Sequence, residues 1–116
     1  MIEAFIGHMV GDYLFQTDWM GNLKKYQLPP LITHLLVYTF FIWLLTGWPI
    51  WALVITFIAH GALDGTMFVK WWCKITHRTQ FIDQKCIFFP WSWVIIDNTF
   101  HLVQLYLTWK LVEMFI

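Results

Sequence analysis

Three pairs of histidine and aspartate lie four positions apart in this sequence, and they carry its clearest chemical signal. The pairs are His8 with Asp12, His60 with Asp64, and Asp97 with His101. Because residues four apart share one face of a helix, each pair would present an imidazole and a carboxylate together. A further histidine, His34, lies between the first two pairs.

Imidazole nitrogens and carboxylate oxygens are typical ligands of divalent metal ions. The set favours Zn, with Mn, Fe and Ni as alternatives, over Ca or a metal that prefers thiolates. Seven such groups are enough for one or two ions. The predicted metal ligands are His8, Asp12, His34, His60, Asp64, Asp97 and His101. An aspartate among Asp12, Asp64 and Asp97 that is not a ligand would serve as a general base.

Two other interpretations use the same residues. A single histidine–aspartate pair can simply be a hydrogen bond that joins two helices. A chain of buried ionisable groups can also conduct protons or ions.

Other polar residues flank the three pairs. Gln16, Tyr38, Asn98 and Gln104 would either orient ligands or substrate, or form hydrogen bonds between helices. Glycines at positions 7 and 11, and again at 61 and 65, form small-xxx-small patterns that allow helices to approach closely.

The composition indicates that these groups are positioned inside a membrane. Of the 116 residues, 59% are hydrophobic and 12% are charged, well below the quarter that is usual in soluble domains. Aromatic residues make up 21%, which suits membrane interfaces. Basic and acidic residues are equal in number, so no charge excess favours nucleic acid as a partner.

Hydrophobic segments predict an all-α fold, a single-domain transmembrane four-helix bundle. The expected spans cover residues 2–19, 31–47, 51–69 and 91–114, with a long loop at about 70–90. The first span carries several polar residues and must therefore hide one face against protein.

The basic residues predict an orientation. Lys24 and Lys25 lie between the first two spans, and the loop after the third span is also basic, whereas the short turn near Gly47 has no basic residue. The positive-inside rule then places both basic loops in the cytoplasm and both termini outside. Because the fourth span runs outward, the reversed order of Asp97 and His101 puts every aspartate on the cytoplasmic side of its histidine. Lys24, Lys25 and Lys70 would anchor this topology or attract an anionic headgroup.

The same residues carry a family resemblance. The stretch 7–20, His34 with its neighbours, and the stretches 60–64 and 97–102 resemble a family of small bacterial and phage membrane proteins of unknown function, DUF3307. In the family pattern a glutamine follows the aspartate at the position where Asn98 stands here. The resemblance implies several transmembrane helices in the bacterial cytoplasmic membrane. A looser likeness to membrane-bound metal-dependent hydrolases rests on the intramembrane histidines and aspartates alone.

Two functions fit these expectations. The first is a metal-dependent hydrolase that acts on an amphiphilic or phosphate-containing substrate, such as a lipid, at the cytoplasmic leaflet. The second is a non-enzymatic bundle that handles ions or protons, or modulates a host membrane process, with a structural metal or a polar core. A chain this short leaves little room for a substrate pocket, which favours a homo-oligomer.

Overall fold

The computed structural model describes residues 1–24, 26–83, 85–87, 89 and 91–116. Its described residues form helices, turns and loops, with no strand, which confirms the all-α prediction. The helices are α1 (Ile2–Met9), a π turn (Val10–Leu14), α2 (Asp18–Leu23), α3 (Leu28–Thr46), α4 (Ile50–Gly65), α5 (Phe68–Ile75), a 3₁₀ turn (Thr79–Phe81) and α6 (Trp91–Phe115).

Three long helices, α3, α4 and α6, correspond to the second, third and fourth predicted spans. Within the described residues, however, only α3 is by itself long and apolar enough to cross a membrane. Helices α4 and α5 meet the same criterion together, but they are bent by 65° at the break between them. The described residues therefore form an all-α fold with one clear candidate span, α3, and a second only if α4 and α5 are one bent span.

The first predicted segment, 2–19, is not one continuous helix. The helix ends with the π turn at Leu14, and a new helix, α2, begins at Asp18. Thr17 caps α2, since its hydroxyl accepts a hydrogen bond from the Met20 amide at 3.4 Å. The predicted loop at 70–90 likewise begins inside α5. Lys25 and Pro90, expected to mark a basic loop and a loop end, lie outside the described residues.

Local sequence explains the limits of α3, the central helix. Pro29 and Pro30 lie in its first turn, where their missing amide hydrogens cost nothing. Gly47 ends it with φ = 65°, a left-handed conformation that glycine adopts without strain, and its amide donates to the Trp43 carbonyl.

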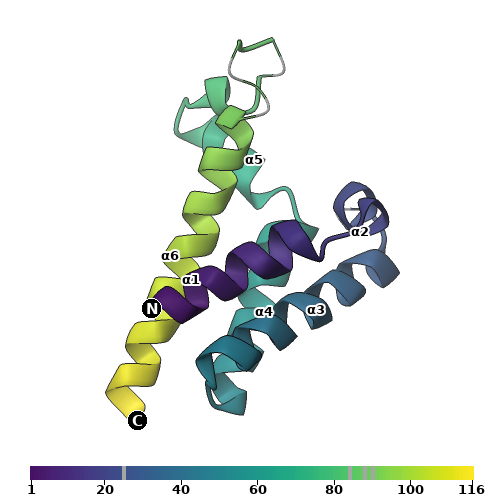
Figure 1. Cartoon of the computed structure of the whole chain (residues 1–116). Coiled ribbons are helices and arrows are strands. Elements are labelled where there is room, and N and C mark those ends of the chain that lie inside the picture. Colours follow the sequence, from purple (N-terminus) through teal and green to yellow (C-terminus); the bar gives the residue numbers. More distant parts are fainter. Residues whose placement is uncertain (25, 84, 88, 90) are drawn as a thin grey trace.

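Helix α3 connects the rest of the fold. Helix α1 packs mainly on α3, α3 on α4, and α4 on α6 (Figure 1). Gly11 permits the close approach of the π turn to α3, because a Cβ atom there would lie 3.0 Å from the Tyr38 Cα atom. A Cβ on Gly7 would similarly lie 3.2 Å from the Phe41 carbonyl oxygen. The small residues of the first segment therefore have the predicted role.

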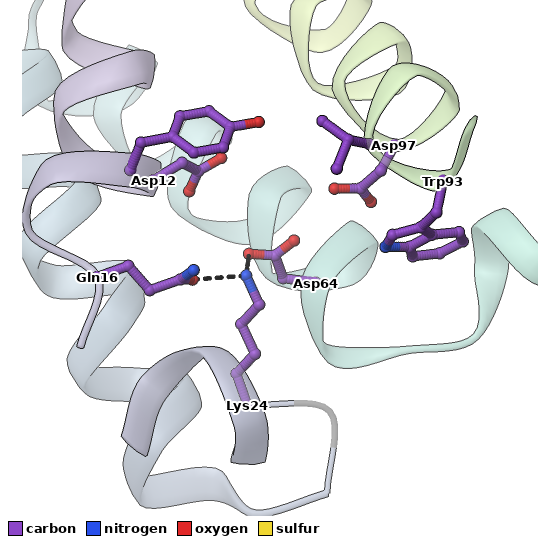
Figure 2. A pocket seen from close by; sticks show the side chains of 8 residues that line it. Asp12, Gln16, Lys24, Asp64, Trp93 and Asp97 are labelled. Carbon is purple, nitrogen blue, oxygen red and sulfur yellow. Dashed lines mark hydrogen bonds and ion pairs between the residues drawn. The ribbon is translucent and has the colours of Figure 1, made fainter. Parts of the chain in front are cut away.

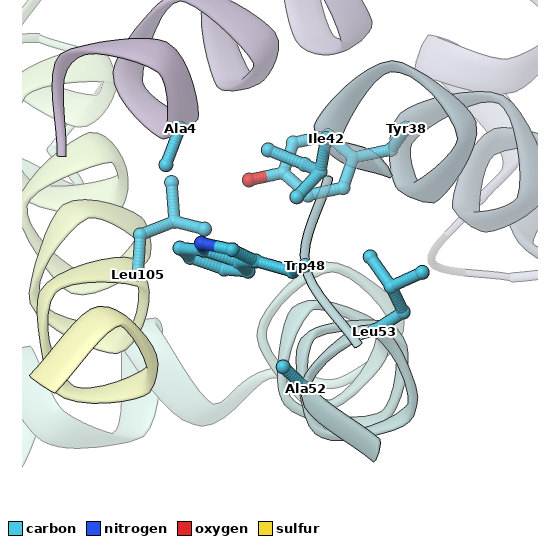
Figure 3. Close-up of a cluster of buried hydrophobic side chains, with 7 residues drawn as sticks. All are labelled: Ala4, Tyr38, Ile42, Trp48, Ala52, Leu53 and Leu105. Atoms are coloured by element: carbon cyan, nitrogen blue, oxygen red, sulfur yellow. The ribbon is translucent and has the colours of Figure 1, made fainter. Parts of the chain in front are cut away.

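A buried apolar cluster holds α1, α3, α4 and α6 together (Figure 3). It consists of Ala4, Tyr38, Ile42, Trp48, Ala52, Leu53 and Leu105. Trp48 comes from the turn between α3 and α4 and inserts its indole among the helices. Tyr38 also contacts His8 and His60, so the cluster adjoins the candidate site through this residue.

The outer surface is also apolar. Large hydrophobic side chains that are exposed on the long helices include Leu36, Phe40, Trp43, Ile58, Ile95 and Leu107. Scattered exposed apolar residues are ordinary, but a surface on which they recur along several helices is typical of contact with lipid or a partner.

Candidate metal centre

Four ligand groups from three helical segments meet in the interior. Asp12 comes from the π turn, His34 from α3, and both His60 and Asp64 from α4. The two histidines are fully buried and Asp64 is 2% exposed. The structure therefore brings four of the seven predicted ligands together in this cluster.

The ligand atoms lie close to one another. His34 Nε2 is 3.0 Å from His60 Nε2, 3.2 Å from Asp12 Oδ1 and 2.8 Å from Asp64 Oδ2. His60 Nε2 is 3.3 Å from Asp12 Oδ1 and 3.1 Å from Asp64 Oδ2. Zinc ligands at about 2.0–2.1 Å from the ion lie about 3.3 Å apart in a tetrahedron. The spacing therefore fits two nitrogen and two oxygen ligands of one divalent ion after a small expansion.

One of these atoms makes no conventional hydrogen bond. Asp12 Oδ1 is buried and accepts no hydrogen bond from the described residues, although it faces the two ring nitrogens. An unsatisfied buried carboxylate oxygen is costly, and a cation bound between it and the rings would remove that cost. The donor set and this atom both fit a metal ion.

Packing orients the two histidine rings. The Nδ1 atoms of His34 and His60 have no hydrogen-bond partner in the described part of the chain. The Tyr38 ring stacks on the His60 ring, with centroids 3.7 Å apart and planes inclined by 15°. The rings are thus held by contact with their neighbours rather than by hydrogen bonds from their second nitrogens.

The Asp12 carboxylate depends on the π turn. The amide of Phe15 donates to the Val10 carbonyl at 3.1 Å, which is the i→i+5 pattern of a π turn. Such turns are rare and occur frequently at functional sites. Helical spacing predicted that Asp12 would share a face with His8, but it gave no sign of the wider turn.

Asp64 also belongs to a second ligand group, together with Asp97 and His101 of α6. Its Oδ2 atom faces the first group, while its Oδ1 atom lies 3.0 Å from His101 Nε2. His101 Nδ1 donates to the backbone carbonyl of Asp97 at 2.8 Å and lies 3.7 Å from the Asp97 carboxylate.

His8 lies beside these groups but outside both of them. Its Nδ1 atom is 3.0 Å from the Tyr38 hydroxyl and 3.4 Å from Asp12 Oδ2, and its Nε2 atom is 3.0 Å from Asn98 Oδ1. The Asn98 amide in turn donates to the Tyr13 hydroxyl. Both ring nitrogens of His8 are therefore engaged by protein groups, and the residue links α1, α3 and α6. Of the two roles expected for Tyr38 and Asn98, these contacts match hydrogen bonds between helices.

A polar cavity of about 220 Å³ adjoins the ligands (Figure 2). It is lined by Asp12, Tyr13, Gln16, Lys24, Asp64, Trp93, Val94 and Asp97. Lys24 folds back from the end of α2, and its Nζ atom lies 2.8 Å from Asp64 Oδ2 and 2.7 Å from Gln16 Oε1. Sequence reasoning placed Lys24 near the mouth of the site but did not predict its contact with a candidate ligand.

Gln16 and Gln104, both expected near the ligand pairs, lie in different surroundings. Gln16 lines the cavity, where its Oε1 atom accepts a hydrogen bond from Lys24. Gln104 instead donates to the Thr108 hydroxyl at 2.9 Å and lines an apolar groove between α4 and α6. Tyr13 and Trp93 line the cavity and were not predicted. Tyr13 directly follows Asp12, which is the one sequence signal that pointed to it.

Comparison with known proteins leaves the activity open. No curated protein and no solved structure matches this chain. A family model described as a protein of unknown function, DUF3307, matches residues 1–115 and therefore includes every ligand group described above. The chain belongs to the DUF3307 family.

Proposed function

We propose that this chain is a multi-pass membrane protein that binds a divalent metal ion and uses it to hydrolyse an amphiphilic or phosphate-containing substrate. The observation that carries the proposal is the cluster of Asp12, His34, His60 and Asp64 beside a polar cavity. Zn is the first choice for two imidazoles and two carboxylates, with Mn, Fe or Ni as alternatives.

The membrane part of the proposal rests on α3, on the bent pair α4 and α5, and on the apolar outer surface. Two basic loops would face the cytoplasm, so the cavity would open toward the cytoplasmic leaflet of a bacterial inner membrane. A substrate with an apolar tail could then approach from the bilayer while its polar group enters the cavity.

Groups along the cavity suit hydrolysis. A bound divalent ion lowers the pKa of water and polarises the bond to be cleaved. In a site with one ion, Asp97 stands across the cavity from Asp12 and serves as the general base. The Lys24 ammonium group and the Gln16 amide, already paired with each other, would bind an anionic oxygen of the substrate.

Metal content tests the proposal first. The protein, purified in mild detergent, is expected to contain at least one equivalent of metal by elemental analysis. Asp12→Asn and His60→Gln should lose it, whereas Asp18→Asn, which changes an exposed aspartate in α2, should keep it. A folded wild-type protein that takes up no metal would exclude the metal site.

A turnover assay tests the second part of the proposal, which is hydrolysis. Metal-loaded protein is incubated with panels of phospholipids and phosphoesters in mixed micelles, beside the Asp12→Asn variant. Cleavage that depends on both the metal and Asp12 supports a hydrolase. Metal binding without any turnover overturns the hydrolase and leaves a metal-binding protein.

A non-enzymatic bundle is the second candidate, and one observation favours it. The Lys24 ammonium group already pairs with Asp64, and His34 and His60 contact the same carboxylate. A polar core of this kind can hold helices together without a metal. In that case Asp12→Asn would lower stability while the wild-type protein binds no metal.

A further inference from the structure

We propose that Asp64, Asp97 and His101 bind a second divalent cation, with Asp64 bridging it to the first. This inference rests on the proposed function, since the first ion is the one held by Asp12, His34, His60 and Asp64. It concerns how many ions the site holds and what kind of substrate they attract.

The two oxygens of Asp64 face different ligand groups. Oδ2 lies 2.8 Å from His34 Nε2, and Oδ1 lies 3.0 Å from His101 Nε2. Asp64 is 2% exposed, so protein groups rather than solvent surround its carboxylate. A carboxylate that offers one oxygen to each of two ions is a common arrangement in dinuclear sites, whose ions lie about 3.5–4 Å apart.

The tautomer of His101 supports the second ion. Its Nδ1–H donates to the Asp97 carbonyl at 2.8 Å, so in the neutral ring Nε2 carries the lone pair. In that neutral ring, Nε2 and Asp64 Oδ1 would both be acceptors 3.0 Å apart, and two acceptors so close repel each other. A cation between them removes the repulsion, and the Nδ1 hydrogen bond to a carbonyl is the usual outer partner of a metal-bound histidine.

The third ligand is the Asp97 carboxylate. It lies four residues before His101 on α6, and its carboxylate and that of Asp64 both line the cavity. Ligand atoms of Asp64, Asp97 and His101 all lie within 4.8 Å of one another. Three protein ligands with an open side toward a cavity is the arrangement of catalytic rather than structural metal sites.

Charge indicates what the second ion would do. The cavity is lined by three carboxylates and one ammonium group. With the aspartates ionised and the imidazoles neutral, one divalent ion makes the site neutral. A second ion makes it positive, which favours an anionic substrate such as a phosphoester over a neutral ester. Asp97 then becomes a ligand, and the two ions together activate the water that Asp97 would otherwise deprotonate.

Manganese provides the test. Metal-free protein in detergent is titrated with Mn²⁺, and bound ions are counted by equilibrium dialysis and examined by electron paramagnetic resonance. The wild-type protein is expected to bind two ions per chain, with the broadened spectrum of a spin-coupled pair. Asp97→Asn and His101→Gln should bind one ion with an uncoupled six-line spectrum. His77→Asn, which changes an exposed loop histidine, should bind two.

The outcomes separate the two proposals. If the wild-type protein binds one Mn²⁺ ion per chain and Asp97→Asn also binds one, the second metal site is refuted and the first metal site still stands. No bound ion overturns both. Circular dichroism and size-exclusion profiles that match the wild type establish that Asp97→Asn and His101→Gln are folded. If both variants fold and still bind two coupled ions, Asp97 and His101 are not ligands and the inference is wrong.

Discussion

The Nε2 atoms of His34 and His60 lie 3.0 Å apart, although the two residues come from different helices and are 26 positions apart in sequence. In the absence of a metal, an Nε2–H of one ring can donate a hydrogen bond to the other ring or to a nearby carboxylate. With a metal, both nitrogens can become ligands with little movement. The same contact therefore suits a protein that alternates between a hydrogen-bonded core and a metal-bound one.

Lys24 is expected to compete with the metal. Its ammonium group lies 2.8 Å from Asp64 Oδ2, the oxygen that also faces His34 and His60. Lys24→Met removes a positive charge beside the ion, and we expect the metal to bind roughly tenfold more tightly, which corresponds to about 1.4 kcal/mol. Competition with a fluorescent chelator measures the change. Lys74→Met is the control, since Lys74 is exposed on α5. Weaker binding in Lys24→Met would mean that the lysine holds Asp64 in position instead.

Tyr38 is expected to stabilise the fold through His8. Tyr38→Phe keeps the ring that stacks on His60 but leaves His8 Nδ1 without its hydroxyl partner at 3.0 Å. Losing that partner in a buried site should lower the free energy of unfolding by about 1–3 kcal/mol. Titration with SDS in mixed micelles unfolds the protein and measures this change in the free energy of unfolding. Tyr106→Phe, at a half-exposed position on α6, should change the free energy of unfolding little. An equal loss of stability in both variants would contradict the role of the Tyr38 hydroxyl.

Gly11 is expected to tolerate no side chain. A Cβ atom there would lie 2.9 Å from the Tyr38 ring and 3.0 Å from the Tyr38 Cα atom, which cannot move without shifting α3. Gly11→Ala should therefore destabilise the protein by about 1–3 kcal/mol. Gly61→Ala is the matched control, because its Cβ would meet only the flexible end of Leu35. Thermal unfolding of the two variants should rank Gly11→Ala as the less stable, and the opposite rank would refute this explanation.

The two native cysteines, which form no disulfide, allow the orientation to be tested. Cys86 is partly exposed in the loop predicted to be cytoplasmic, whereas Cys73 is buried in α5. With Cys73→Ser, a membrane-impermeant maleimide should label Cys86 only after the inner membrane is opened. In a cysteine-free background, Ile50→Cys at the exposed start of α4 should be labelled in intact spheroplasts. Labelling of Cys86 before permeabilisation would reverse the proposed topology.

Much of the site was predictable because helical geometry is simple. The spacing of four placed His60 and Asp64 on one face of α4. The reversed third pair lies on α6, which runs in the direction opposite to α4 (Figure 1). Long apolar segments predicted α3, α4 and α6 to within a few residues, apart from the early end of α4.

Other features depend on interactions that no local pattern contains. The break at 15–17 falls within a polar stretch whose helical spacing continues through it. Lys24 reaches Asp64 only because α2 turns back over α3, a long-range contact between residues 40 apart. His8 looked equivalent to His60 in sequence, yet its neighbours Tyr38 and Asn98 occupy both of its nitrogens.

The π turn at Val10–Leu14 makes the N-terminal segment unusually sensitive to its length. A π turn contains one residue more than the α turn it replaces, and each residue in an α-helix rotates the chain by about 100°. Deleting one residue from this turn would restore an ordinary helix and change the direction of the side chains that directly follow it, while His8 kept its direction. The hydrogen bond between Lys24 and Gln16, two residues beyond the turn, would then have to rearrange. Relatives that differ by a single insertion or deletion here would therefore keep the fold but present a different wall to whatever enters the cavity.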